Sequence, residues 1–183
     1  MIEQNHLDLL LDLNTDENPH SGGDLLDHLR GTHDFLQDWG NDQAVCLGGL
    51  FHSIYGTQSY KTESASLEDR QRIREVIGER AERLAFLFSV SIRSGFFEGI
   101  GKEKATVWDR IHEENIPVTQ ADLRDLIEME VANYLEFMPR THFTIEELDA
   151  FEAKVERGKP LLLPLAYAAI KAGIRSKRIA IAS

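Results

Sequence analysis

The chain has 183 residues, an apolar fraction of 42% and a formal net charge of −11 at neutral pH. This composition fits one globular domain with a sizeable core and excludes a disordered chain. The acidic balance argues against nucleic acid and anionic membrane surfaces as partners, because both repel it, whereas a small anionic ligand held in a local pocket stays compatible.

Targeting and membrane signals are missing from the sequence. Residues 1–14 lack the basic flank and the small-residue cleavage site of a signal peptide, and the apolar run over 161–170 is too short to span a bilayer. We therefore expect a cytoplasmic protein. The run over 161–170 would also suit burial in a homodimer, so a monomer and a dimer both stay open.

The amino-terminal part of the chain predicts three helices. A short leucine-rich helix over 6–13 is followed by a helix from Asp24 to about Trp39, whose apolar arc includes His28. Asn41 or Asp42 then caps a third helix, which we expect to run to about residue 55.

This third segment is apolar on nearly every side, so it belongs in the middle of the fold. Gly48 and Gly49 allow neighbouring elements to approach its backbone. The single cysteine, Cys46, lies within it and is expected to be a small buried side chain. His52, near the end of the segment, must find a hydrogen bond, a charge partner or a metal.

The rest of the chain is also predicted to be helical. No stretch shows sustained alternation with β-branched residues, so no strand is predicted. The chain is therefore expected to be all-α, with a single domain over 1–183, a motif core over 19–60 and C-terminal helices over 144–175 packing on it. The expected helices cover 67–77, 79–93, 105–112, 119–138, a segment opening at the capping-box residue Thr144, and 159–172, with a loop over 94–101.

His28 and His52 lie on consecutive helices, and both point into the core by pattern. Two imidazoles on adjacent helices can meet across a packed interface and bind one metal ion. Spacing alone does not separate this hypothesis from the commoner one, in which each histidine is a hydrogen-bonded core residue.

Two motifs resemble a known family. Residues 21–28, Ser-Gly-Gly-Asp-Leu-Leu-Asp-His, and the apolar helix that ends in Gly49-Leu50-Phe51-His52-Ser53 resemble the start of an HD-superfamily domain. The likeness is strongest to the guanosine-tetraphosphate hydrolase domain of stringent-response enzymes and to uncharacterised bacterial proteins with HSGG and GLFHS-YGT motifs. It implies a helical bundle and a metal-dependent phosphohydrolase, with His28 and His52 as metal ligands and a divalent ion (Mn, Fe, Mg or Zn) as cofactor.

The chain departs from the HD pattern at both carboxylate ligands. Ser53 stands in place of the aspartate of the His-Asp pair, and Asn133 stands in place of the aspartate on a later helix. Serine and asparagine are neutral and hold a divalent ion weakly, so a changed ligand set and the absence of metal both stay open.

Glu130 offers a replacement carboxylate. It falls within the apolar stripe of the helix over 119–138, where a carboxylate needs a strong partner. That partner is either a metal shared with His28 and His52, which would make Glu130 catalytic, or an arginine such as Arg93 or Arg124. Asp24, four residues before His28, could orient that imidazole or simply favour the start of its helix.

Several further residues are candidates for binding a small-molecule ligand, most readily an anionic one. The candidates are His20, Ser21, Ser53, Tyr55, Thr57 and Asn133. For His20, Ser21, Tyr55 and Thr57 there is also a simpler interpretation as a loop, turn or packing residue.

Three hypotheses of function follow. The first is an HD-like hydrolase of a small phosphorylated compound, nucleotides included, that uses His28, His52 and Glu130. The second is a binding or regulatory module that kept the pocket and lost the chemistry. The third is an iron-dependent oxygenase or a metal-free acid/base enzyme on the same fold.

Overall fold

The computed structural model describes residues 1–20 and 23–182, and for residues 19, 20 and 23 it describes the backbone alone. The described part is mostly helical but not purely so, because it also holds two short antiparallel β pairs. The elements of the first half are α1 (Gln4–Asp12), β1 (Pro19–His20), β2 (Gly23–Asp24), α2 (Leu25–Asp38), α3 (Gln43–Leu50), the 3-10 turn η1 (Leu67–Asp69), α4 (Arg70–Ile77) and α5 (Glu79–Val90). Those of the second half are α6 (Ser94–Glu98), β3 (Ala105–Asp109), β4 (Glu114–Val118), α7 (Gln120–Phe137), α8 (Ile145–Gly158) and α9 (Pro164–Ala182).

The predicted caps at Thr119 and Thr144 are confirmed, whereas Asp42 stands at the N-cap of α3 without a side-chain hydrogen bond. The side chains of Asp24, Thr119 and Thr144 each accept a hydrogen bond from a backbone N–H in the first turn of α2, α7 and α8 respectively. The last two form capping boxes, which satisfy two otherwise unpaired backbone donors at once.

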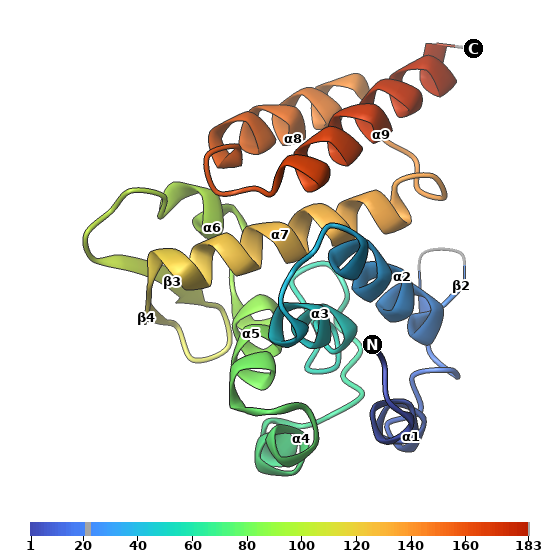
Figure 1. The fold of residues 1–183 in the computed structure, drawn as a ribbon, viewed down its shortest axis with the longest axis vertical. Coiled ribbons are helices and arrows are strands. Elements are labelled where there is room, and N and C mark those ends of the chain that lie inside the picture. Colours follow the sequence, from blue (N-terminus) through green and yellow to red (C-terminus); the bar gives the residue numbers. More distant parts are fainter. Residues whose placement is uncertain (21–22, 183) are drawn as a thin grey trace.

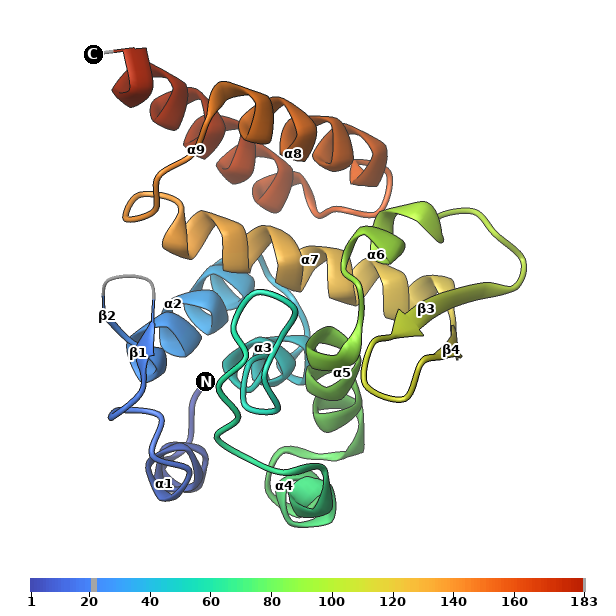
Figure 2. The ribbon, with the colours of Figure 1, turned by 180° about the vertical axis from the view of Figure 1, so that it is seen from behind.

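Helix α7 forms the middle layer of the fold. Figures 1 and 2 show it lying between the α8–α9 pair on one side and α2, α3 and α5 on the other. Helix α3 packs against α2, α5 and α7, and its residues from Val45 to Leu50 are all buried, as expected for a segment that is apolar on every side.

The two glycines of α3 set how closely its neighbours approach. A Cβ atom on Gly49 would lie 2.3 Å from Leu36 Cδ1 of α2, and one on Gly48 would lie 3.0 Å from Leu84 Cβ of α5. A larger residue at Gly49 would therefore force the buried Leu36 side chain or the α2–α3 contact to shift, close to His52, which follows α3.

Four element predictions differ from the structure. The segment over 105–112 is not a helix, because its first residues form strand β3, which pairs with β4 from Ala105↔Val118 to Asp109↔Glu114. Its burial alternates, with Ala105, Val107 and Asp109 inside and Trp108 outside, which is the two-residue period of a strand. Helix α3 ends at Leu50 rather than near residue 55, a short helix α6 occupies the predicted loop over 94–101, and α9 covers 164–182 instead of 159–172.

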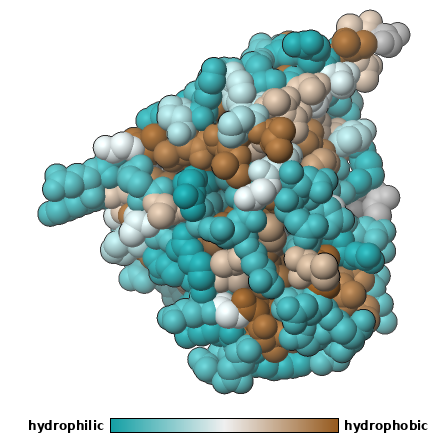
Figure 3. Space-filling model, viewed as in Figure 1, coloured by the Kyte–Doolittle hydropathy of each residue, from teal (hydrophilic) through white to brown (hydrophobic). Residues whose placement is uncertain are grey.

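The C-terminal helices pack on the rest through α7 and α6. Within the run over 161–170, Leu162, Ala166 and Ile170 are buried in the core, while Leu165 is 59% exposed. Figure 3 shows a mostly hydrophilic surface on which apolar residues gather in a band between α7 and α9. A homodimer through this run stays a prediction. None of the described helices is both long and apolar enough to cross a membrane.

Candidate functional site

The structure brings His28 and His52 together under the middle layer. His28 lies on α2, and His52 lies in the turn that follows α3; both are 1% exposed. Their Nε2 atoms are 3.2 Å apart, and Asn133 Oδ1 of α7 lies 3.1 Å from each of them. Three side chains from three elements therefore aim their polar atoms at one buried point.

The outer nitrogen of each ring is held by an acceptor. His52 Nδ1 donates to the carbonyl oxygen of Gly49 at 2.6 Å, and His28 Nδ1 donates to the Glu136 carboxylate. With Nδ1 protonated in each neutral ring, each Nε2 presents a lone pair, so the two Nε2 atoms and Asn133 Oδ1 form a set of three acceptors.

Glu136 is the carboxylate that serves His28. It lies one helical turn after Asn133 on α7 and also accepts two hydrogen bonds from Arg140 Nη2, at 2.6 and 2.8 Å. Burial alone would raise the pKa of the Glu136 carboxyl, but the bonds from His28 and Arg140 outweigh it and hold the pKa below its usual value. Gly31 leaves room for this contact, because a Cβ there would lie 2.7 Å from Glu136 Cγ.

The backbone around His52 is fixed from α5. Ser89 Oγ donates to the His52 carbonyl oxygen at 2.9 Å, and the Phe88 ring meets the imidazole edge-on, with 5.0 Å between the ring centroids. These contacts restrict the imidazole to one orientation, which a ligand for a metal or a substrate requires.

The donor set fits a divalent ion. Donor atoms at about 2.1 Å from a metal lie about 3.0 Å apart in octahedral and about 3.4 Å apart in tetrahedral coordination. The three separations, 3.1, 3.1 and 3.2 Å, fall within that range. Three protein ligands leave positions for water or substrate, as in catalytic metal sites. All three ligands are neutral, and no described group of three or more His, Cys, Asp or Glu side chains is arranged to hold a metal ion.

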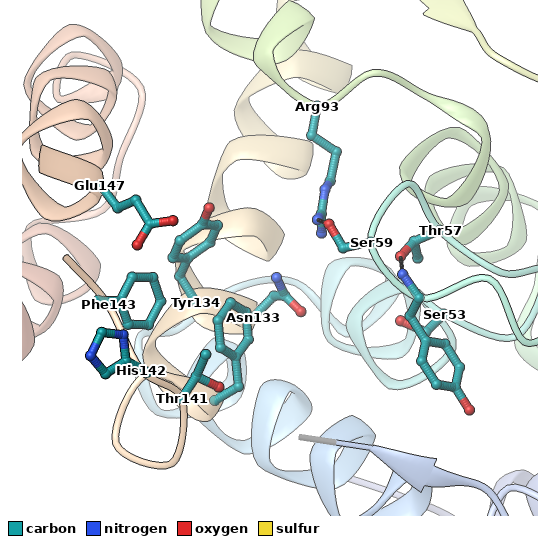
Figure 4. A pocket seen from close by; sticks show the side chains of 12 residues that line it. Ser53, Thr57, Ser59, Arg93, Asn133, Tyr134, Thr141, His142, Phe143 and Glu147 are labelled. Carbon is teal, nitrogen blue, oxygen red and sulfur yellow. Dashed lines mark hydrogen bonds between the residues drawn. The ribbon is translucent and has the colours of Figure 1, made fainter. Parts of the chain in front are cut away.

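A pocket of about 410 Å³ opens beside this cluster. Asn133 is shared by the two: its Oδ1 faces the histidines, and the residue lines the pocket. Figure 4 shows the pocket between a polar side, with Ser53, Ser59 and Arg93, and an aromatic side that includes Phe143, with Asn133 between them. The full described lining is Ser53, Thr57, Ser59, Tyr60, Arg93, Asn133, Tyr134, Phe137, Thr141, His142, Phe143 and Glu147.

Several candidates lie where the sequence placed them. Ser53 is buried at the pocket wall, next to His52. Thr57 also lines the pocket, and its Oγ1 accepts from the backbone N–H of Tyr60 at 3.0 Å. Ser21 falls outside the described residues, and for His20 only the backbone, in β1, is described.

For three candidates the structure shows the simpler of the alternatives weighed above. The Glu130 carboxylate lies 3.3 Å from Arg93 Nη1, which is the arginine pairing weighed above, and no described contact joins it to the histidines. The Tyr55 hydroxyl donates to the buried Glu82 at 3.3 Å instead of lining the pocket. Asp24 caps α2 by accepting from the Asp27 N–H at 2.7 Å, and the acceptor that orients His28 is Glu136.

Sequence reasoning missed Glu136, Arg140 and the aromatic side of the pocket. A signal for the first two was present. Asn133 and Glu136 lie one turn apart on α7, and Arg140 follows four residues later, in the turn after the helix. No sequence pattern indicated that Phe143, in the segment between α7 and α8, would face Arg93 across a pocket.

Residues 9–93 match the family model of a domain of unknown function (DUF6817). The match covers just under half of the chain and includes His28, His52 and Arg93, while Asn133 and Glu136 lie beyond it. Neither the curated proteins nor the solved structures contain a match to this chain.

Proposed function

We propose that this chain is a single-domain, HD-like hydrolase of a small phosphorylated compound and that it uses a divalent metal ion held by His28, His52 and Asn133. The observation that carries the proposal is the convergence of the two Nε2 atoms and Asn133 Oδ1 within 3.2 Å of one another. The resemblance to HD domains placed Asn133 at the position of a metal-binding aspartate, and its contact with both histidines supports that assignment.

Each residue has a separate part in this proposal. Hydrogen bonds at Nδ1, to Glu136 and to the Gly49 carbonyl oxygen, keep the Nε2 lone pairs of His28 and His52 directed at one point. Asn133 supplies a neutral oxygen, so the three ligands leave the charge of an ion uncompensated. A divalent ion in such a site supplies a nucleophilic water near neutral pH and offsets phosphate charge.

Arg93 supports binding of an anionic substrate. Its guanidinium lines the pocket, its Nη2 donates to Ser59 Oγ at 2.9 Å, and it lies over the Phe88 ring at 5.2 Å. These contacts hold the cation in place before a ligand arrives, which lowers the ordering cost of binding.

One observation favours a second candidate, a metal-free module that binds a small ligand. The amide nitrogen Nδ2 of Asn133 is buried and has no hydrogen-bond partner among the described residues. Turning the amide by 180° would let Nδ2 donate to His28 and His52 and would satisfy both rings without an ion.

Metal-reconstituted hydrolysis separates the two candidates. The protein is stripped with chelator, reloaded with Mn²⁺, Fe²⁺, Zn²⁺ or Mg²⁺, and assayed for phosphate release from a panel of phosphomonoesters and nucleotides. The proposal expects metal-dependent turnover that falls about 100-fold or more in His28→Ala and His52→Ala. His112→Ala is the matched control, because His112 is half-exposed on the β3–β4 turn and its imidazole bonds to Asp109. Turnover without metal, or turnover that survives both variants, would contradict the proposal.

A further inference from the structure

The charges around the pocket are few, and they restrict the ligands it can hold. Arg93 is the only lysine or arginine among the described lining residues, and Glu147 is the only carboxylate among them. The positive charge of Arg93 is already shared, because Glu130 lies behind it with Oε2 at 3.3 Å from Nη1. Without a metal ion, the side chains of the pocket therefore attract one anionic group and repel further negative charge.

The opposite side of the pocket is suited to a flat apolar group. Phe137 and Phe143 stack with centroids 6.1 Å apart and an interplanar angle of 13°, and Tyr134 lies 6.2 Å from Phe143. Figure 4 shows Tyr134 and Phe143 across the pocket from Arg93 and Ser59. Stacked rings that line a pocket bind aromatic or other flat groups through dispersion and burial.

We infer that the side chains of this pocket by themselves select compounds with a single anionic group joined to a flat apolar body and disfavour polyphosphates. The anionic group, a phosphate or a carboxylate, is placed by Arg93 beside Asn133, and the body lies against Phe143 and Tyr134. This inference rests on the proposed function in taking the pocket next to His28 and His52 as the substrate pocket.

Glu130 then acts as a charge-tuning residue. It does not line the pocket, but its carboxylate is paired with the one guanidinium that does. Burial raises the pKa of the Glu130 carboxyl and Arg93 opposes that shift. At an alkaline pH that ionises the carboxylate, removing its charge leaves Arg93 with its full field directed at the ligand, so anion binding should strengthen. If the ion pair were merely structural, breaking it would lower the stability of the protein and would not strengthen anion binding.

Binding of phosphonates tests the inference without any turnover, since the C–P bond is not hydrolysed by a phosphatase. Calorimetric titration is performed at pH 8, with chelator present, using phenylphosphonate, methylphosphonate and methylenediphosphonate. Phenylphosphonate is expected to bind at least tenfold more tightly than either of the others. Equal binding of methylphosphonate would overturn the role of the aromatic side, and equal or tighter binding of methylenediphosphonate would overturn the charge argument.

Three variants complete the test. Arg93→Gln is expected to weaken phenylphosphonate binding at least tenfold, Glu130→Gln to strengthen it severalfold, and the control Arg83→Gln, outside the pocket, to leave it unchanged. If Arg93→Gln alone does not fold, the double variant Arg93→Gln/Glu130→Gln leaves no buried charge unpaired and should show the same loss. A Glu130→Gln protein that binds more weakly, or a double variant that binds as the wild type does, would overturn the inference.

The binding experiment and the hydrolysis assay can refute the two proposals independently. If the phosphonate pattern holds while metal-dependent turnover is absent, the hydrolase proposal is wrong and the pocket assignment stands. If turnover is present but phenylphosphonate binds no more tightly than the other two phosphonates, the inferred ligand class is wrong and the hydrolase proposal stands.

Discussion

Replacing Glu136 by glutamine tests how far the histidine cluster depends on its support from α7. The Glu136 carboxylate is 9% exposed and accepts from both His28 Nδ1 and Arg140 Nη2. A glutamine side chain has one oxygen and one NH₂ group, so it can accept from one of these donors but presents a second donor to the other. The substitution keeps the shape of the side chain and removes its charge.

The structure sets the size of the expected effect. A hydrogen bond to a charged group contributes about 1.5–3 kcal/mol to stability. The Arg140 side chain is 39% exposed and regains water when its partner is lost, so its share is reduced by solvent screening. We expect Glu136→Gln to lower the free energy of unfolding by about 1–3 kcal/mol, and to weaken binding of a divalent ion by about 10- to 100-fold, because His28 is no longer held by a carboxylate.

Urea unfolding measures the free energy of unfolding. Titration of the chelator-stripped protein with Zn²⁺ measures the affinity for a divalent ion. Glu103→Gln is the control, since it removes the same charge from an exposed position between α6 and β3. If Glu136→Gln lowers stability but binds Zn²⁺ as tightly as the wild type, Glu136 does not orient a metal ligand, and the reasoning about His28 is refuted.

Three further predictions concern other parts of the fold and the site. Gly49→Ala should destabilise the protein by about 1–3 kcal/mol in urea unfolding, because the new methyl group would overlap the buried Leu36 side chain; an unchanged midpoint would show that the helices relax freely. Asn133→Asp should tighten Mn²⁺ binding about tenfold or more in a titration, since a carboxylate would replace a neutral ligand, and weaker binding would contradict the proposed ligand set. Burial lowers the pKa of His33. Below about pH 6.5 the unfolded chain therefore binds a proton at this residue that the folded chain does not. The free energy of unfolding then decreases as the pH is lowered, by at most about 1.4 kcal/mol per pH unit. Urea unfolding between pH 7.5 and 5.5 should show a smaller fall in His33→Gln, while a variant of the exposed His142 keeps the wild-type fall.

Much of the helical framework could be predicted from the sequence, because its signals are local. Caps at Asp24, Thr119 and Thr144 depend on residues three positions apart, and the buried α3 is apolar in almost every residue. Strand β3 is hard to predict because five alternating residues are a weak signal and its partner β4 carries a proline.

The candidate site could be predicted only in part. The meeting of His28 and His52 follows from two buried faces on adjacent helices, and Asn133 was indicated by resemblance. The pairing of Glu130 with Arg93 and of Glu136 with His28 depends on the rotation of α7 about its axis. That rotation is set by packing against α2, α5 and α9 together, which no local pattern in α7 encodes.

In the proposed site, three side chains from three elements hold one metal ion. Equilibrium dialysis against Zn²⁺ or Mn²⁺ followed by elemental analysis tests this proposal most directly, with circular dichroism as the check that each variant is folded. We expect about one ion per chain for the wild type and for His112→Ala, and loss of that ion in His28→Ala, in His52→Ala and in Asn133→Leu. A folded wild type that retains no metal, or a folded His52→Ala protein that retains as much as the wild type, would contradict it.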